Sequence, residues 1–285
     1  MATFTNQAAL TYNGVTTSSN IVTGEILEPL RVTKDAVNAS YNDTEAVTYV
    51  VNLVNTGSAA LTGLTVTDDL GAYTAGALTA VPLTYVDGTV RYYTNGVLQA
   101  APAVVEGPPL TFSGLTVPAG GNGLLLYDAR PNRTAPLAAG ATMTNTVTVS
   151  GAGLTTPVQA AQTVAVATAP RLRIGKSVSP ASVSPGGRLT YTFTIENTGN
   201  TAADAADLVS LTDTFTPVLR DLAVALNGTA WAPATNYTYN ATTGVFATVP
   251  GQITVPAATY AQNTATGAWT VTPGASTLTV AGTVT

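Results

Sequence analysis

LRVTKDAVNASYNDTEAVTYVVNLVNTG, residues 30–57, is the stretch that decides the fold, because it occurs twice. It aligns without a gap with LRIGKSVSPASVSPGGRLTYTFTIENTG, residues 172–199, at a constant offset of 142 residues (172 minus 30). The alignment pairs Lys34 with Lys176, and Asn-Thr-Gly ends both segments. Self-similarity at a fixed offset indicates a repeated structural unit. The sequence therefore predicts two copies of one domain.

The composition favours β-structure throughout. Charged residues make up 9% of the 285 residues, against about 25% in an average soluble domain. Thr, Val, Ala, Gly and Asn dominate instead, and apolar residues alternate with Thr and Asn in the repeated segments. Such alternation is typical of half-buried strands. We predict an all-β protein with many short strands, long enough for one or two cores.

Several classes of function are excluded by residues that the sequence lacks. It contains no Cys and no His, which removes disulfides, structural zinc, imidazole triads and thiol nucleophiles. The net charge of -5 gives no basic stripe for nucleic acid, and no apolar run is long enough to span a bilayer. We expect no cofactor, no metal and no membrane insertion. Polar strand residues directly follow Met1, so the sequence shows no signal peptide. We expect either that a leader has been removed or that the protein is assembled without the usual secretion route, which is compatible with a fibre on a spore surface.

The two copies differ in their final segment. TMTNTVTVSGAG, residues 142–153, lies near the end of the first copy, whereas the second copy stops at Thr285 without an equivalent. TFTNQAALTYNG, residues 3–14, aligns with that segment and matches Asn6 to Asn145. The predicted parts are a donor arm, a first β-sandwich domain, and a second β-sandwich domain lacking its last strand: residues 1–28, 29–169 and 170–285.

The position of the arm predicts self-assembly. A sheet that lacks one strand exposes unpaired backbone groups and an apolar groove, and an extended segment that fills it gains ladder hydrogen bonds. To reach the second domain of its own chain, the arm would have to cross the whole first domain. We therefore expect the arm to enter the second domain of a neighbouring subunit. Such a head-to-tail contact repeats into an open filament unless it closes a ring.

The lysines lead to a family resemblance. Lys34 and Lys176 are the only lysines, so the other eight of the ten cations are arginines. The pattern L-x-(I/V)-x-K, followed by a T-Y-x-(F/V)-x-(I/L)-x-N-T-G strand, a strand-ending Asp and a final T-N-x-x-x-V strand, resembles the bacterial surface conserved-repeat family called domain of unknown function eleven. The first copy departs from that pattern at one turn, where residues 42–45 read Asn-Asp-Thr-Glu. The resemblance implies immunoglobulin-like β-sandwiches used as stalk or wall modules. It also implies spontaneous isopeptide bonds, which some such surface and pilin domains form between a first-strand Lys and a last-strand Asn beside a buried acid.

The chemistry of that bond requires these three residue types. A lysine amine is nucleophilic only when neutral, and burial lowers its pKa because the charged form loses hydration. A buried carboxylic acid stays protonated, polarises the amide carbonyl and passes a proton to the departing ammonia. Holding amine and amide in contact supplies roughly 7 to 11 kcal/mol of the barrier. The reaction needs no cofactor and occurs once at each site, so we expect no enzyme in the ordinary sense.

The candidate residues form two sets of one lysine, one asparagine and one acid. They are Lys34, Asn145 and Asp68 within the first domain, and Lys176 and Asp213 of the second domain with Asn6 from the next subunit. Asp69 is a rival for Asp68, but Thr67-Asp68 matches Thr212-Asp213 in the second copy. Glu196 is a rival acid that the first copy replaces with Val54.

The function predicted from these features is a structural subunit of a bacterial surface filament or pilus-like appendage, outside the cell. Its subunits join by donor-strand complementation and are locked by intramolecular and intermolecular isopeptide bonds. The alternative is a monomeric surface stalk, adhesin or carbohydrate-binding module, because sandwich loops can carry binding sites. The loops at Tyr92-Tyr93 and at residues 231–239 are the aromatic candidates for that alternative.

Overall fold

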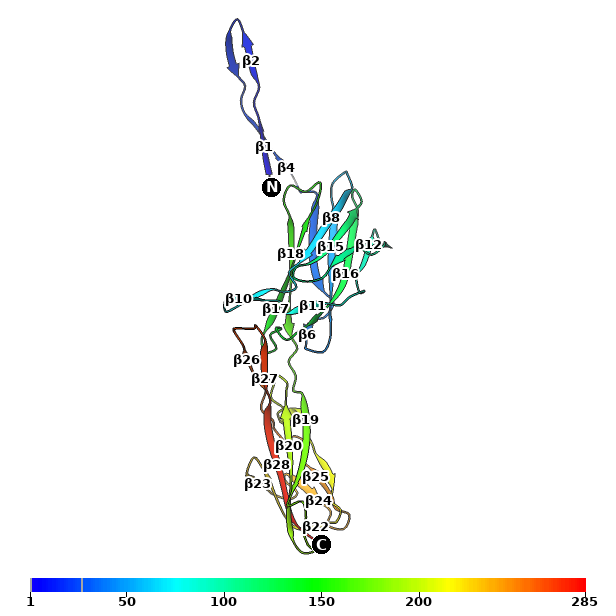
Figure 1. The fold of residues 1–285 in the computed structure, drawn as a ribbon, viewed down its shortest axis with the longest axis vertical. Helices are drawn as coiled ribbons and strands as arrows, with labels where there is room; N and C mark the ends of the chain where they lie inside the picture. The colour runs from blue at the N-terminus through cyan, green and yellow to red at the C-terminus, as the bar shows by residue number, and fades with distance from the viewer. Residues whose placement is uncertain (1, 27) are drawn as a thin grey trace. The chain divides into compact units, whose positions relative to one another are not determined.

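The computed structural model describes residues 2–26 and 28–285, which are built almost entirely of β-strands (Figure 1). Met1 and Leu27, both within the predicted arm, lie outside the described residues. One 3₁₀ turn, Ala205–Asp207, is the only helical element in the described part of the chain. No helix in that part is long and apolar enough to cross a membrane. The prediction of an all-β protein with two β-sandwiches is confirmed.

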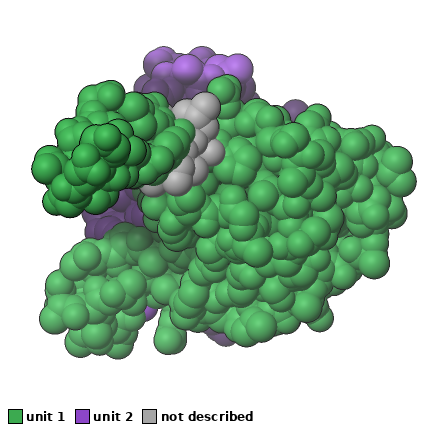
Figure 2. Space-filling view, turned by 90° about the horizontal axis from the view of Figure 1, so that it is seen from above, with its two compact units in different colours: residues 1–135, 142–165, 264–267 green, residues 136–141, 166–263, 268–285 purple. Residues whose placement is uncertain are grey.

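The chain divides into two compact units, coloured separately in Figure 2. Unit 1 comprises residues 1–135, 142–165 and 264–267, and unit 2 comprises residues 136–141, 166–263 and 268–285. The domain bounds drawn from the sequence stay predictions.

Unit 1 is a sandwich of two six-stranded sheets. The first sheet has the order β13-β12-β16-β7-β5, with β11 also paired to β16. Its strands are β5 (Leu30–Ala36), β7 (Val47–Asn55), β11 (Leu83–Tyr85), β12 (Arg91–Thr94), β13 (Val97–Leu98) and β16 (Asn122–Pro131). Strand β7 alternates buried and half-buried side chains along its whole length, so one face points into the core.

The second sheet of unit 1 has the order β14-β15-β8-β17-β18-β6. Its strands are β6 (Ser40–Tyr41), β8 (Leu61–Asp68), β14 (Ala103–Val105), β15 (Leu110–Val117), β17 (Thr142–Ser150) and β18 (Val158–Val166). Strands β9 (Tyr73–Ala75) and β10 (Leu78–Ala80) form a separate hairpin. Strand β8 is therefore covered along both edges, by β15 on one side and by β17 on the other.

Unit 2 repeats the first sheet and shortens the second. The first sheet has the order β19-β20-β28-β22-β23, and the second has the order β21-β25-β24. The strands are β19 (Leu172–Ser179), β20 (Arg188–Asn197), β21 (Thr212–Thr214), β22 (Leu219–Leu226), β23 (Thr229–Trp231), β24 (Tyr237–Tyr239), β25 (Val245–Thr248) and β28 (Gly274–Val284), with a hairpin of β26 (Thr259–Gln262) and β27 (Trp269–Thr272). Among the described strands, none pairs with the edge of β21 opposite β25.

Residues 2–26, called the arm below, fold into a long hairpin of their own (Figure 1). Strands β1 (Ala2–Asn6) and β4 (Val22–Ile26) pair with each other, as do β2 (Ala9–Tyr12) and β3 (Val15–Ser18). The turn is Asn13-Gly14, both at positive φ (47° and 77°), which is the Asn-Gly hairpin signal. Every side chain from Thr3 to Thr23 is exposed. An isolated two-stranded hairpin in water has only marginal stability. We therefore expect the arm to be stable only when another surface covers one of its faces.

Candidate functional site

The centre of unit 1 contains a buried ion pair between its two sheets. Lys34 is on β5 of the first sheet, and Asp68 ends β8 of the second. The Lys34 Nζ lies 2.6 Å from Asp68 Oδ2, and neither side chain is accessible to solvent. Lys is almost never fully buried without a partner. The two residues that the repeat singled out therefore meet inside the sandwich.

Two tyrosines complete the surroundings of this pair. Tyr49 on β7 and Tyr127 on β16 are directly opposite in the strand register. Their ring centroids lie 4.7 Å and 6.0 Å from Lys34 Nζ, respectively. The Tyr127 hydroxyl donates a hydrogen bond to Asp68 Oδ2, the oxygen that also accepts from Lys34. Asp68 is thus held by one cation and one phenol.

Burial shapes the protonation of this cluster. Loss of hydration lowers the pKa of Lys34 below its usual 10.5, although the neighbouring Asp68 charge acts in the opposite direction. Burial raises the pKa of Tyr127, and the Asp68 charge raises it further, so its phenol keeps its proton. Burial likewise raises the pKa of Tyr49. Burial thus moves Lys34 toward its neutral form, beside a phenol that keeps its proton.

Asn145 faces the same interior from β17. Val147 is opposite Asp68 in the register of β17 and β8, so Asn145, two residues earlier, points to the same side. Its side chain is fully buried. Asn145 Oδ1 accepts a hydrogen bond from the backbone N–H of Gly71 at 3.2 Å. Gly71 has φ +73°, a conformation that favours glycine, and it presents this N–H toward the amide.

The amide nitrogen of Asn145 is a buried polar atom without a well-formed hydrogen bond. Within the described residues, neither Asn145 Nδ2 nor the Tyr49 hydroxyl makes a hydrogen bond of full geometry. The Asn145 side chain still acts on that hydroxyl, since it lowers the pKa of Tyr49 against the larger effect of burial. Buried polar groups without partners are rare and call for an explanation. Here the carbonyl oxygen accepts from an N–H donor, whereas the amide nitrogen lacks a hydrogen bond of full geometry. A donor at the carbonyl oxygen is what stabilises the oxyanion when an amine attacks the amide carbon.

The rival acid Asp69 has a different role. Its Oδ1 accepts hydrogen bonds at 2.9 Å from the backbone N–H groups of Gly71 and Thr146. It therefore holds the turn after β8 to the middle of β17. Adjacent strand residues face opposite ways, and the structure places Asp68, the preferred candidate, against the lysine.

Unit 2 repeats the lysine cluster in an open form. Lys176 on β19 forms an ion pair with Asp213 Oδ2 on β21. Its Nζ lies 4.7 Å from the ring centroid of Tyr191, the same distance as between Lys34 and Tyr49. Phe215 is also close, at 5.7 Å. The Lys176 side chain, however, is 41% exposed.

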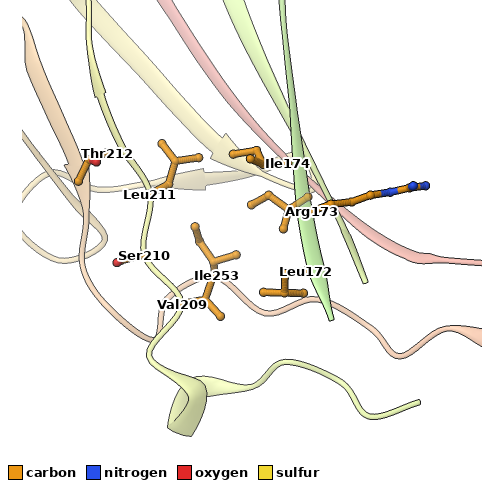
Figure 3. Close-up of a pocket in the computed structure, with 9 residues that line it drawn as sticks. Leu172, Arg173, Ile174, Val209, Ser210, Leu211, Thr212 and Ile253 are labelled. Atoms are coloured by element: carbon orange, nitrogen blue, oxygen red, sulfur yellow. The ribbon is translucent and has the colours of Figure 1, made fainter. Parts of the chain in front are cut away.

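An apolar groove lies between β19 and the segment leading into β21, and its lining residues Ile174 and Thr212 come just before Lys176 and Asp213 in their strands. The groove has a volume of about 340 Å³. Figure 3 shows Leu172, Ile174 and Leu211 gathered there, while Arg173 points away. Its lining residues are Leu172, Arg173, Ile174, Ile195, Val209, Ser210, Leu211, Thr212 and Ile253. Ile174 is 59% exposed, although it is a strand residue of a sandwich.

Strand β17 accounts for the difference between the units. In unit 1 it pairs with β8, and its residues Met143, Asn145, Val147 and Val149 are all buried. The corresponding edge of unit 2 belongs to β21, which pairs only with β25 among the described strands. The groove therefore lies where a strand equivalent to β17 would be. The sequence offered no asparagine within unit 2 as a bond partner for Lys176. Asn6, the predicted partner, lies on the exposed strand β1 of the arm. That intermolecular pairing stays a prediction.

Two features of the unit 1 site were missed by the sequence analysis: the Tyr127 phenol and the Gly71 N–H. Tyr127 follows the apolar residues Leu124, Leu125 and Leu126 in the sequence. Alternation of inward and outward side chains along that strand puts Leu125 and Tyr127 on the same, inward face. The Gly71 donor depends on backbone conformation and carries no such signal. Unit 2 has Val280 opposite Tyr191, so its acid has no equivalent phenol.

The aromatic side chains considered for the adhesin alternative are buried or half-buried. Tyr92 and Tyr237 are buried core residues. Tyr93, Trp231 and Tyr239 are half-buried. An exposed aromatic platform is therefore not present at these two loops.

Comparisons with known proteins give distant structural similarities. No protein-family model matches the chain, and no curated protein matches its sequence. The pilus backbone RrgB from Streptococcus pneumoniae is 12% identical, with a TM-score of 0.35, over 86% of this chain and 55% of that chain. BcpA, the major pilin subunit of Bacillus cereus, is 12% identical, with a TM-score of 0.37, over 95% and 73%. Domains D2 and D3 of the major pilin SpaD from Corynebacterium diphtheriae are 11% identical, with a TM-score of 0.35, over 85% and 88%. This chain thus spans just over half the length of the RrgB chain that it matches.

Proposed function

We propose that this chain is the structural subunit of a bacterial surface fibre, in which the arm of one subunit fills the groove of unit 2 in the next. The observation that carries the proposal is the open groove beside Lys176, at the edge that β17 covers in unit 1. The arm supplies what the groove lacks: an extended, exposed hairpin with an apolar face. Phe4 is 52% exposed and Leu10 67% exposed.

The register of unit 1 specifies how the arm docks. Val147 is opposite Asp68, and Val149 is opposite Val66. Transferred through the sequence alignment, Ala8 comes to lie opposite Asp213, and Leu10 opposite Leu211. Leu211 lines the groove. The inward face of the docked strand is then Phe4, Asn6, Ala8 and Leu10, with Asn6 where unit 1 has Asn145.

In unit 1 the reaction joins two strands of one chain. The neutral Lys34 Nζ attacks the Asn145 side-chain carbonyl carbon and forms a C–N bond. The bond from that carbon to Nδ2 breaks, and the amide nitrogen leaves as ammonia with a proton from the amine. Asp68 is positioned to move that proton, and the Gly71 N–H stabilises the developing oxyanion.

In unit 2 the same exchange joins two subunits. Lys176 Nζ attacks Asn6 of the incoming arm, Asp213 moves the proton, and one ammonia leaves. Each subunit then carries one internal bond and one bond to its neighbour. This gives the fibre covalent continuity without cysteine, at the cell surface where we place it. No other substrate is turned over.

Intact-mass analysis with denaturing electrophoresis tests this function. Each bond removes one ammonia, about 17 Da, and wild-type protein should give a ladder that survives boiling in detergent. Asn6→Ala should abolish the ladder but keep the internal mass loss. Asn145→Ala should keep the ladder and lose the internal bond. A single monomer band from wild-type fibres, with no mass loss, would reject the covalent lock, and a wild-type monomer under native conditions would favour the stalk or adhesin alternative.

A further inference from the structure

We propose that docking of the arm, rather than folding of unit 2, activates Lys176 for bond formation. This inference rests on the proposed function and adds an order of events to it. The internal bond of unit 1 forms as soon as that unit folds. The intermolecular bond waits for a neighbour, so that a free subunit keeps its lysine inert.

The two units share a lysine, an aspartate and a tyrosine ring in equivalent positions, closed in unit 1 and open in unit 2, although unit 2 has Val280 in place of the Tyr127 phenol. Lys34 and Lys176 each contact one aspartate and each lie 4.7 Å from a tyrosine ring. Lys34 has no accessible side-chain surface, whereas Lys176 is 41% exposed. Folding alone therefore builds the ion pair in both units but excludes water in only one.

The excluded water is what separates an inert amine from a nucleophile. A hydrated ammonium ion paired with a carboxylate stays protonated, whereas burial lowers the pKa of the amine, as it does for Lys34. The titratable groups that face Lys176 are Asp213 on β21 and Tyr191 on β20. The inward face of the arm around Asn6 adds no charge, because its members are Phe4 and Ala8. Docking thus changes hydration at Lys176 without adding a new charge.

Phe4 is the residue of the arm best suited to seal the site. It aligns with Met143, which is buried two residues before Asn145 on the inward face of β17 and lies against Gly71, the residue whose N–H binds the Asn145 carbonyl. In the free arm its ring packs over Gly24, where any side chain would collide with it. The large ring therefore already lies on the hairpin next to Asn6. It can cover one side of Lys176 when the hairpin docks.

The experiment compares wild type with full-length Phe4→Ala and with Phe4→Met, which restores the residue type found in unit 1. Native sedimentation gives the number of docked junctions, and denaturing electrophoresis over time gives the number of bonded ones. At pH 7 we expect bond formation per docked Phe4→Ala junction to be at least about ten-fold slower, the effect of one pKa unit on the neutral amine. Raising the pH should restore more of the rate in Phe4→Ala than in wild type, because more of a hydrated amine becomes neutral.

Two results separate the possible failures. If Phe4→Ala junctions bond at the wild-type rate with the wild-type pH profile, activation by docking is wrong, although strand donation stands. If Asn6→Ala subunits show no native association, the proposed assembly itself is wrong. The internal mass loss of one ammonia in unit 1 confirms that each variant has folded. Phe4→Met should match wild type in both rate and pH profile, and an equally slow Phe4→Met would reject sealing as the cause.

Discussion

At the scale of single residues, the main contrast is between two lysines in equivalent positions that differ in what covers them and in the phenol beside the acid, which only unit 1 has. Lys34 and Lys176 share the acid and the aromatic ring, but β17 covers only the first. An uncovered ion pair is solvated and contributes little. A covered pair is costly unless it is fully satisfied, and conversion to a neutral amide removes that cost. In the proposed mechanism, the residue types set which bond can form, and burial of the lysine sets when it forms.

The tyrosines of unit 1 give a pH prediction at this scale. Burial raises the pKa of Tyr41 and Tyr92 to about 12, from 10.0, and it also raises the pKa of Tyr49 and Tyr127. The folded state holds these protons more tightly than the unfolded state. The resulting stability is complete below pH 10 and is lost as pH rises toward 12 and above. Phenolate absorbance should show a late group of tyrosines in native protein and a single transition near 10 in denaturant. Ionisation of all tyrosines together near pH 10 in native protein would contradict this.

At the scale of elements, the difference between the units is one hairpin. Strands β17 and β18 extend the second sheet of unit 1 beyond β8, whereas the second sheet of unit 2 ends at β21 among the described strands. The arm has the same two-stranded form, with β1 and β2 in the place of β17. A hairpin brings its own partner strand, so docking extends the sheet by two strands at once. The outer edge left after docking is then that of β3 and β4.

The alternation of the arm predicts which of its positions accept a charge. Leu10 aligns with buried Val149, whereas Thr5 aligns with exposed Thr144. Leu10→Glu would bury an unpaired carboxylate in an apolar groove, so it should keep subunits monomeric. Thr5→Glu adds the same charge to the outward face and should leave assembly intact. Sedimentation velocity distinguishes the two. Equal assembly by both variants would rule out the predicted register.

At the scale of the whole molecule, the proposed internal bond would link β5, the first strand of the sandwich of unit 1, to β17. A bond between Lys34 and Asn145 would close a loop of 111 residues (145 minus 34). In the loop-entropy treatment of cross-links, closing a loop of this length stabilises the folded state by about 4 to 5 kcal/mol. Between subunits, the proposed bond between Lys176 and Asn6 would pass tension from one chain to the next through covalent links.

The stability of unit 1 should therefore depend on the internal bond. Asn145→Ala in the Leu10→Glu background, which isolates the subunit, should unfold at lower temperature and lower denaturant concentration than Leu10→Glu alone. The free energy of unfolding should fall by about 4 kcal/mol. This is well above the roughly 1 kcal/mol expected from loss of the Asn145 hydrogen bond alone. Calorimetry and denaturant titration measure this loss. A loss near 1 kcal/mol would mean that the bond does not form.

The sequence by itself determined the repeat, the all-β class and the residue types at each site. An offset of 142 residues pairs the lysines, and the match of Thr67-Asp68 with Thr212-Asp213 favours Asp68 over Asp69. These features are local or repeated, so they are visible without coordinates. Only the tertiary structure decided that Lys34 is sealed and Lys176 is open, that Tyr127 binds the acid, and that the Gly71 N–H meets Asn145. Those contacts join residues distant in the chain, and burial depends on which strand covers a site, which no local pattern specifies.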